Sequence, residues 1–210
     1  MTQVFLASRN AKKLAEMQRI LGEHAPGIEV VGLDDVPAYD EPVEDQPTFE
    51  GNALLKARAG LAATGVPTLA DDSGLCVDAL NGMPGVLSAR WAGPPGSDKT
   101  GADQRNNELL LAQLSDIPEH RQGAHFVCAV AFAHPDGSEL VVHGEMSGVV
   151  IRELRGSGGF GYDVLFVTDE HRASGTTSAE LDADEKDRIS HRGRALREIA
   201  PLVATALTAS

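Results

Sequence analysis

Two adjacent carboxylates directly follow a short apolar run in the stretch Leu69-Ala70-Asp71-Asp72-Ser73-Gly74-Leu75. Such a run is typical of a β-strand that ends in a turn, because Asp, Ser and Gly all favour turns. Ligands of α/β proteins bind at the carboxyl ends of strands, so we expect both acids at such an end. Neighbouring side chains on a strand point to opposite faces, so Asp71 and Asp72 need not share one task.

This acid pair has two interpretations. One carboxylate could hold a hard cation such as Mg²⁺ through oxygen, while the other orients or deprotonates a water. An acid pair in an ordinary turn is the simpler alternative. Phosphate-binding features elsewhere in the chain favour the first interpretation.

A second candidate segment, Ser8-Arg9-Asn10-Ala11-Lys12-Lys13, follows a predicted strand over Gln3 to Ala7. The apolar spacing after it predicts a helix with Leu14, Met17, Ile20 and Leu21 on one face. A capped helix N-terminus with lysines in its first turn attracts phosphate, although a solvated cap with surface lysines has the same pattern. The glycines of a P-loop are absent from this segment.

An acidic, proline-bearing loop is predicted from Asp34 to Pro47, before a helix from Thr48 to about Thr64 with Thr48 as its cap. Glu44 and Asp45 are the acids of that loop nearest the helix, and either is a candidate second metal carboxylate. Asn52 and Lys56 are four residues apart in the helix and therefore share a face that could reach a ligand.

The second half of the chain is rich in predicted strands. We expect strands over Leu75–Leu80 and Val164–Val167 and a hairpin of 125–134 with 139–151. Helices are expected over Gly101–Leu114 and from about Arg192 to Thr208, the second with Leu196, Ile199, Leu202, Val203 and Leu207 facing inward.

The segment Arg155 to Asp163 contains four glycines in nine residues. Ordering so many glycines costs backbone entropy. Glycines are nevertheless useful where the backbone must approach a ligand closely. Phe160 and Tyr162 could stack on a planar base, although a tight turn with both aromatic rings in the core fits equally well.

Composition limits the partners of the chain. A formal net charge of −13 over 210 residues disfavours nucleic-acid polymers, whose binding depends on Lys and Arg, while local basic clusters suit a small anionic ligand. The sequence has no apolar run of membrane-spanning length and no pattern of a signal peptide, and its two cysteines have no metal-type spacing. We therefore expect a cytoplasmic protein that binds no membrane.

Six segments of the chain together resemble the inosine triphosphate pyrophosphatase family, in the order in which that family has them. They are spread over nearly the whole chain and are residues 8–13, 48–57, 70–75, 84–90, 158–163 and 190–193. The resemblance implies an α/β fold with an elongated mixed β-sheet flanked by helices, and two lobes around a central nucleotide-binding cleft. Residues 1–210 would then form a single domain with lobes that are not independent, and the protein would be a homodimer.

The implied activity is Mg²⁺-dependent hydrolysis of ITP, dITP and XTP to the monophosphate and pyrophosphate. By resemblance, Asp72 is the general base and, with Glu44, a metal ligand. The other implied substrate-binding residues are Ser8, Arg9, Asn10, Ala11, Lys12, Lys13, Lys56, Ser73, Phe160, Gly161, Tyr162, Asp163, Lys186, His191 and Arg192.

Three positions depart from the family pattern. Ser8 replaces a more common Thr and keeps the hydroxyl, and Val164 replaces a common Pro after Asp163. Gly51 stands where the family often has Glu before Asn52, and Glu50 lies one position earlier.

Two other functions remain open from the sequence. The first is a pyrophosphatase of the same architecture that acts on modified pyrimidine nucleotides, since a fold does not fix a substrate. The second is a non-catalytic nucleotide-binding protein, which would not need the general base that Asp72 offers.

Overall fold

The computed structural model describes residues 2–8, 11–24, 27–93 and 101–208. Its strands form one six-stranded sheet in the order β2-β1-β3-β4-β5-β6. The strands are β1 (Thr2–Leu6), β2 (Ile28–Val31), β3 (Thr68–Val77), β4 (Gly123–Ala133), β5 (Glu139–Val150) and β6 (Phe166–Thr168). The helices are α1 (Ala11–His24), α2 (Phe49–Thr64), α3 (Ala102–Gln113), α4 (Ala183–Ile189) and α5 (His191–Thr208). The mixed α/β sheet flanked by helices confirms the predicted fold class.

The sheet combines both strand directions. β1 runs parallel to β2, with Val4 opposite Val30, and parallel to β3, with Leu6 opposite Leu69. β5 and β6 are antiparallel, with Val149 opposite Val167. The predicted hairpin turn is confirmed, since the Gly137 amide donates to the His134 carbonyl.

The chain divides into two compact units. The first contains residues 1–72, 128–144 and 190–210, and the second contains residues 73–127 and 145–189. The strands β3, β4 and β5 each contribute residues to both units. That the chain is one domain, and not two independent ones, stays a prediction.

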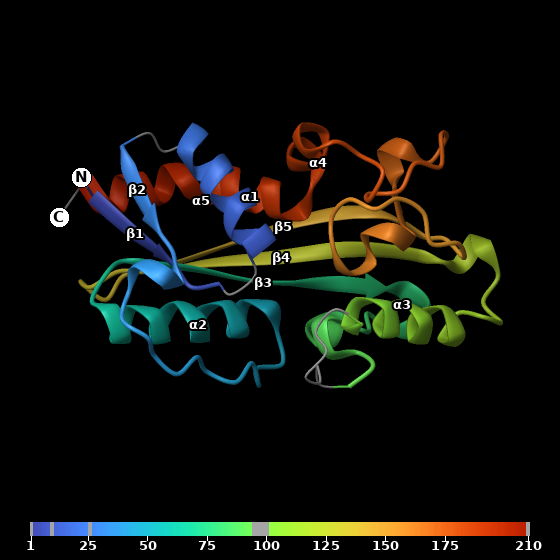
Figure 1. Cartoon of the computed structure of the whole chain (residues 1–210), viewed down its shortest axis with the longest axis horizontal. Coiled ribbons are helices and arrows are strands. Elements are labelled where there is room, and N and C mark those ends of the chain that lie inside the picture. The colour runs from blue at the N-terminus through green and yellow to red at the C-terminus, as the bar shows by residue number, and fades with distance from the viewer. Residues whose placement is uncertain (1, 9–10, 25–26, 94–100, 209–210) are drawn as a thin grey trace. The chain divides into compact units, whose positions relative to one another are not determined.

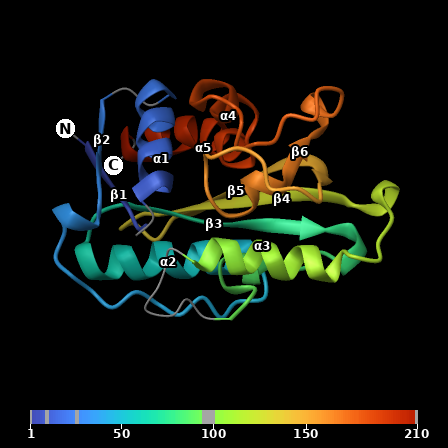
Figure 2. The same cartoon turned by 45° about the vertical axis from the view of Figure 1, so that its right-hand side comes forward.

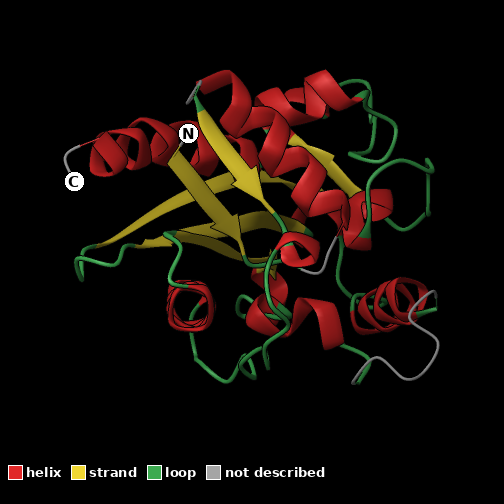
Figure 3. Ribbon diagram, turned by 60° about the vertical axis from the view of Figure 1, so that its left-hand side comes forward, coloured by secondary structure: helices red, strands yellow, loops and turns green. Residues whose placement is uncertain are grey.

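The first unit has helices on both faces of its strands, with α1 and α5 on one side and α2 on the other (Figures 1 and 3). Strand alternation separates its two cores. Val4, Leu6 and Leu69 pack in a core cluster with residues of α1 and α5. Phe5 and Ala70 pack in another cluster with small residues of α2.

The helix α2 lies close to the sheet because its inner face is small. Ala53, Ala57 and Gly60 are buried, and a Cβ on Gly60 would lie 2.8 Å from a methyl carbon of Thr68. The predicted cap is confirmed, since the Thr48 side chain accepts a hydrogen bond from the Gly51 amide. This close approach brings the polar side chains of α2 within reach of β3.

The second unit has a core of its own, in which Leu110 and Leu114 pack with Leu75 and Phe126. The helix α3 lies along one face of the strands in this unit (Figure 2). The rings of Phe126 and Phe166 meet edge to face, with their centroids 4.8 Å apart. This geometry stabilises aromatic pairs.

The structure corrects several expectations about these elements. Asp71 and Asp72 lie inside the continuous strand β3 and not at a strand end, so the predicted turn and the separate strand over Leu75–Leu80 do not exist. The strand predicted from Val164 begins at Phe166, because Gly161–Leu165 is a 3-10 turn. Leu202 is 44% exposed and does not face inward. The short helix α4 was not expected, because Ile189 is its one buried residue and its sequence has no apolar period.

Candidate active site

Strand alternation places Asp71 and Asp72 on different faces of β3. Asp71 lies on the same face of β3 as Leu69, which faces α1 and α5. Asp72 lies on the same face as Ala70, which faces α2. The two carboxylates are 2% and 6% exposed. The structure confirms that they have different partners, which explains why a strand can carry two acids side by side.

The Asp72 carboxylate meets two side chains of α2. Asn52 Nδ2 donates to Asp72 Oδ2 at 2.9 Å, and Lys56 Nζ lies 4.0 Å from Asp72 Oδ1. Asn52 is fully buried, and its Oδ1 accepts from the Gln46 amide at 3.0 Å. One amide side chain therefore connects α2 both to the acid of β3 and to the acidic loop.

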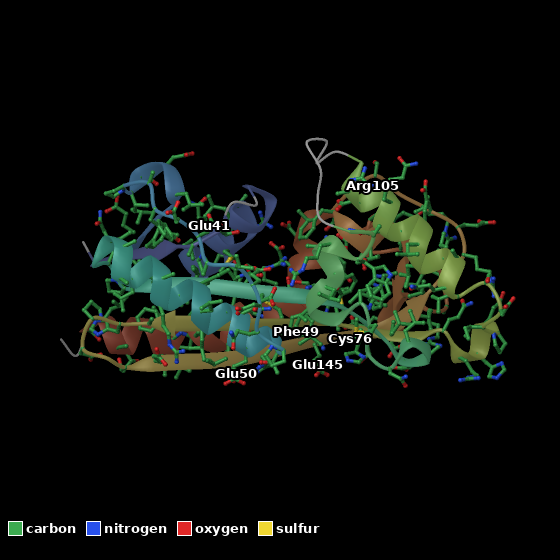
Figure 4. All side chains as sticks on the ribbon, turned by 90° about the horizontal axis from the view of Figure 1, so that it is seen from below. Glu41, Phe49, Glu50, Cys76, Arg105 and Glu145 are labelled. Carbon is green, nitrogen blue, oxygen red and sulfur yellow. The ribbon has the colours of Figure 1, made fainter. Side chains whose placement is uncertain are left out.

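The acidic loop brings Glu44, and not Asp45, to Lys56. Glu44 Oε1 lies 2.5 Å from Lys56 Nζ. Asp45 is exposed and accepts from the Gln46 side chain at 2.7 Å. Glu50, at the start of α2 in Figure 4, is also exposed, and its Oε2 is 3.9 Å from His143 Nε2. Of these three acids, Glu44 is the one that shares an ammonium group with Asp72.

Opposing effects set the charge of Lys56. Burial lowers the pKa of its ammonium group, while the nearby charges of Asp71, Glu44 and Asp72 and the hydrogen bond to Glu44 raise it. The net result is a pKa above the ordinary 10.5. Lys56 therefore stays cationic at neutral pH and can neutralise a bound phosphate.

This raised pKa has a consequence for stability. A cation whose pKa is higher in the folded state stabilises the fold fully below pH 10.5 and loses that contribution as the pH rises through the folded pKa. We expect the free energy of unfolding of the unmodified protein to exceed that of Lys56→Met near pH 9, and the gap to narrow above pH 10.5. Urea unfolding at several pH values measures this gap.

Arg58→Met is the matched control for that measurement. Arg58 lies two residues further along α2 and pairs with Glu139 at 2.6 Å, but a guanidinium does not titrate in this range. The difference in free energy of unfolding between the unmodified protein and Arg58→Met should therefore stay constant with pH. If the difference for Lys56→Met also stays constant, the assigned charge balance of Lys56 is contradicted.

Two carboxylates that contact the same cationic group can also hold a metal cation. Glu44 and Asp72 supply the oxygen ligands that Mg²⁺ prefers. Within the part of the chain that the structure describes, no group of three or more His, Cys, Asp or Glu side chains could hold a metal ion. The residues therefore fit a cation that takes its remaining ligands from phosphate and water, which is how proteins usually bind Mg²⁺.

On the other face of β3, Asp71 forms a buried ion pair with α5. Arg192 Nε lies 3.3 Å from Asp71 Oδ2, and the two side chains are 2% and 1% exposed. Cys128 Sγ is 3.9 Å from the same carboxylate oxygen. Arg192 is a predicted site residue, but its ion-pair partner could not be predicted, because Asp71 lies 121 residues away in the chain.

Gly144 of β5 allows the start of α5 to take this position. A Cβ on Gly144 would collide with the carbonyl oxygen of His191 and lie 2.8 Å from the Ala195 amide nitrogen. Only glycine permits so close an approach of strand and helix. His191 and Arg192 are thereby placed in the buried first turn of α5.

In the second unit, the glycine-rich segment forms a closed set of contacts around Asp163. The Asp163 carboxylate accepts from the Phe160 amide at 2.8 Å and from Lys186 Nζ at 2.6 Å. Lys186 Nζ also lies 5.4 Å from the centre of the Phe160 ring, a cation–π contact. Gly159, at φ +69°, leaves no space for a Cβ beside Asp163 and Lys186. The glycine is therefore needed for this close approach.

Of the two alternatives for Tyr162, the structure favours a ring packed in the core over a ring that stacks on a base. The Tyr162 ring is 4% exposed within the core of the second unit, and its hydroxyl donates to the Ser88 carbonyl at 3.0 Å. Burial and the Asp103 charge raise the pKa of this hydroxyl. Phe160, which is half-buried, is the aromatic ring of this segment that remains for stacking.

The other predicted residues are described to different extents. Ser8 and Ser73 are half-buried, in the first and second unit respectively. Arg9 and Asn10 lie outside the described residues, and only the backbone of Ala11, Lys12 and Lys13 is described, in the first turn of α1. The first unit therefore brings Glu44, Lys56 and Asp72 together, and the second brings Phe160, Asp163 and Lys186 together.

Comparison with known proteins identifies the family of this chain. Residues 4–202 match the Ham1 family. The chain belongs to the Ham1 family. A dITP/XTP pyrophosphatase of Nocardia farcinica is 58% identical over 205 residues, which are 97% of this chain and 96% of that protein. A dITP/XTP pyrophosphatase of Corynebacterium glutamicum is 51% identical over 210 residues, which are 99% of this chain and 100% of that protein.

Solved Ham1 structures have the same fold. A nucleoside-triphosphatase / dITP/XTP pyrophosphatase from Mycobacterium abscessus has a TM-score of 0.75 at 52% identity and covers 95% of this chain and 100% of its own. A HAM1 protein from Coxiella burnetii has a TM-score of 0.83 at 38% identity, with 98% and 100% covered. These relatives confirm the resemblance that the six sequence segments indicated.

Two further observations concern membrane-spanning helices and the cysteines. Among the residues described, no helix has both the length and the apolar character needed to cross a membrane. Cys76 and Cys128 are both buried and form no disulfide. Burial and the nearby charges of Glu145 and Asp78 raise the pKa of Cys76 to about 11, so this thiol is protonated at neutral pH (Figure 4).

Proposed function

We propose that this Ham1 chain hydrolyses non-standard purine nucleoside triphosphates, namely ITP, dITP and XTP, to the nucleoside monophosphate and pyrophosphate. Relatives that are 51% and 58% identical over nearly the whole chain are named dITP/XTP pyrophosphatases. The observation that carries the proposal is the buried carboxylate of Asp72, which meets the Asn52 amide and the Lys56 ammonium. A binding protein needs no such base, so this geometry favours an enzyme.

In this proposal, cationic and backbone groups of the first unit bind the triphosphate. Of the cationic side chains assigned to triphosphate binding, Lys56 is the one whose surroundings the structure describes, and its raised pKa keeps it charged. The start of α1 offers backbone N–H groups and a positive dipole end to phosphate oxygens. The residues assigned to this task by resemblance are Ser8, Arg9, Asn10, Ala11, Lys12, Lys13 and Lys56.

Asp72 and Glu44 would hold a magnesium ion between the protein and the phosphates. When bound, such an ion neutralises phosphate oxygens and the charge that develops during transfer. Lys56 Nζ contacts both carboxylates and can move from Glu44 to a phosphate oxygen when substrate binds. Ser73, at the boundary of the second unit, is proposed to contact the substrate.

Asp72 is proposed as the general base. Its carboxylate takes a proton from a water whose oxygen bonds to the α-phosphorus, while the bond from that phosphorus to the bridging oxygen breaks and pyrophosphate leaves. Asn52 donates to Asp72 Oδ2 and thereby helps to fix the orientation of the carboxylate toward the water. Positioning and charge neutralisation supply most of the acceleration in phosphoryl transfer.

Base recognition is assigned to both units by resemblance. In the second unit, the Phe160 ring is proposed to stack on the purine, with Gly161, Asp163 and Lys186 in support. In the first unit, His191 and Arg192 are proposed to bind the base edge. Inosine and xanthine have an oxygen at C6 that can accept from Arg192, while the amino group of adenine would leave a buried donor unsatisfied.

A turnover panel tests this proposal. We expect pyrophosphate release from dITP and XTP at a kcat/KM at least roughly tenfold above that for dUTP, dTTP and ATP, and a loss of release when magnesium is chelated. Faster release from the pyrimidine nucleotides would instead support the second candidate substrate class. Binding of dITP without any release would show a non-catalytic nucleotide-binding protein.

The homodimer implied by the resemblance and the cytoplasmic location expected from the composition both stay predictions. Light scattering coupled to size-exclusion chromatography measures the first directly. A monomeric mass, together with full pyrophosphate release, would remove the dimer from the proposal and leave the chemistry intact.

A further inference from the structure

One residue of the glycine-rich segment is bound at both of its polar backbone groups by the same helix. The Gly161 amide donates to Asp103 Oδ2 at 2.8 Å. The Gly161 carbonyl accepts from Asn107 Nδ2 at 3.0 Å. Asp103 and Asn107 are four residues apart in α3 and therefore lie on one face of it. We call these two residues the α3 clamp.

The backbone of Gly161 needs such support. Its φ is +62°, in the left-handed region that glycine reaches easily but does not keep without restraint. Among the described residues other than its chain neighbours, no atom lies within 4 Å of where a Cβ on Gly161 would stand, so side-chain packing at that point does not hold the residue. The two hydrogen bonds to α3 therefore restrain both polar groups of this residue's backbone.

The clamp acts on the ring that the proposed function assigns to the base. Phe160 directly precedes Gly161, and its amide donates to Asp163. Asp163 in turn holds Lys186, whose ammonium lies 5.4 Å from the Phe160 ring centre. On the other side, the Tyr162 hydroxyl is bound to Ser88 in the core. With Phe160 and Tyr162 held in this way, Gly161 is the joint between a half-buried ring and a buried one.

We propose that Asp103 and Asn107 are positioning residues for base recognition, which hold Gly161 so that the Phe160 ring and Lys186 keep one arrangement for an incoming purine. This inference rests on the proposed function, because it needs Phe160 to contact the base. It predicts that loss of the clamp weakens binding of ligands that carry a base and leaves binding of bare polyphosphate unchanged.

Asp103 is the better residue to change, because it is exposed while Asn107 is 3% exposed. Asp103→Ala removes the acceptor for the Gly161 amide, and Asp103→Asn keeps an acceptor oxygen in the same place. Gln104→Ala is the matched control, since Gln104 is an exposed neighbour in α3 whose side chain donates to Glu108 at 2.8 Å. Asn107→Asp, which removes the donor to the Gly161 carbonyl, tests the other half of the clamp.

The test is titration calorimetry with two probes, inosine monophosphate and inorganic tripolyphosphate, together with kcat and KM for dITP. For Asp103→Ala and Asn107→Asp we expect the Kd of inosine monophosphate and the KM of dITP to rise about tenfold, with kcat and the tripolyphosphate Kd within about twofold of the unmodified protein. Asp103→Asn should stay within about threefold on every measure, and Gln104→Ala should match the unmodified protein.

Two outcomes would overturn the inference. The first is equal weakening for both probes, and the second is a lower melting temperature with an unchanged Kd for inosine monophosphate, since each indicates a purely structural role. Failure of the proposed function is a separate result: the unmodified protein would then release no pyrophosphate from dITP. Release by the unmodified protein, with base binding insensitive to Asp103 and Asn107, would reject the clamp alone.

Discussion

Asp72→Asn is expected to lower kcat for dITP by about 10²–10⁴-fold, while the Kd for the nucleotide changes little. The amide has almost the same shape as the carboxylate and can keep a hydrogen bond with Asn52, which is 2.9 Å away. It cannot accept a proton from water at neutral pH. Single-turnover release of pyrophosphate, together with calorimetric binding in the presence of Ca²⁺ to suppress turnover, separates the two effects.

The control for that variant is Asp45→Asn. Asp45 lies in the same acidic loop as Glu44, but it is exposed and contacts Gln46 instead of Lys56. This variant removes one negative charge from the same region and should leave kcat and KM unchanged within about twofold. Normal turnover by Asp72→Asn would remove Asp72 from the chemistry, whatever the result for Asp45.

Arg192→Met is expected to destabilise the fold by about 3–5 kcal/mol, because it leaves the Asp71 carboxylate buried without its guanidinium partner. The double variant Arg192→Met with Asp71→Leu removes both charges and should regain most of that stability, since apolar replacement of a whole buried pair is often neutral. Both variants should lack dITP turnover, because the Arg192 guanidinium that would donate to the purine base is absent from both. Urea unfolding measures the first effect and dITP turnover the second.

The exposed pair of Arg58 and Glu139 is the control for the buried one. Its side chains are 58% and 35% exposed, so Arg58→Met should cost less than about 1 kcal/mol. Full dITP turnover by the double variant would show that Arg192 is only a structural residue. A cost for Arg192→Met as small as that for Arg58→Met would contradict the assigned burial of the pair.

The periodic elements of this chain were predictable because their pattern is local. The apolar face of α1, the Thr48 cap of α2 and the hairpin of β4 with β5 all follow from spacings within a few residues. The different partners of Asp71 and Asp72 were predictable for the same reason, since alternation along a strand does not depend on what surrounds it. The continuation of β3 through these acids was not predictable, because partners far away in the sequence keep turn-favouring residues inside the strand.

The supports of the site could not be predicted, because each joins residues far apart in the sequence. Gly144 matters only because it meets the first turn of α5. Asp103 acquires its role only through Gly161, 58 residues further along the chain. Tyr162 and Phe160 look alike as sequence, and only the packing of the second unit distinguishes the buried ring from the half-buried one.

The central claim is that a water, directed by Asp72, attacks the α-phosphorus of a purine nucleoside triphosphate. Hydrolysis of dITP in ¹⁸O-labelled water, followed by mass spectrometry of both products, tests it most directly. The account predicts one ¹⁸O atom in the nucleoside monophosphate and none in pyrophosphate. Label in the pyrophosphate, or release of labelled orthophosphate, would place the attack on another phosphorus atom and contradict the account.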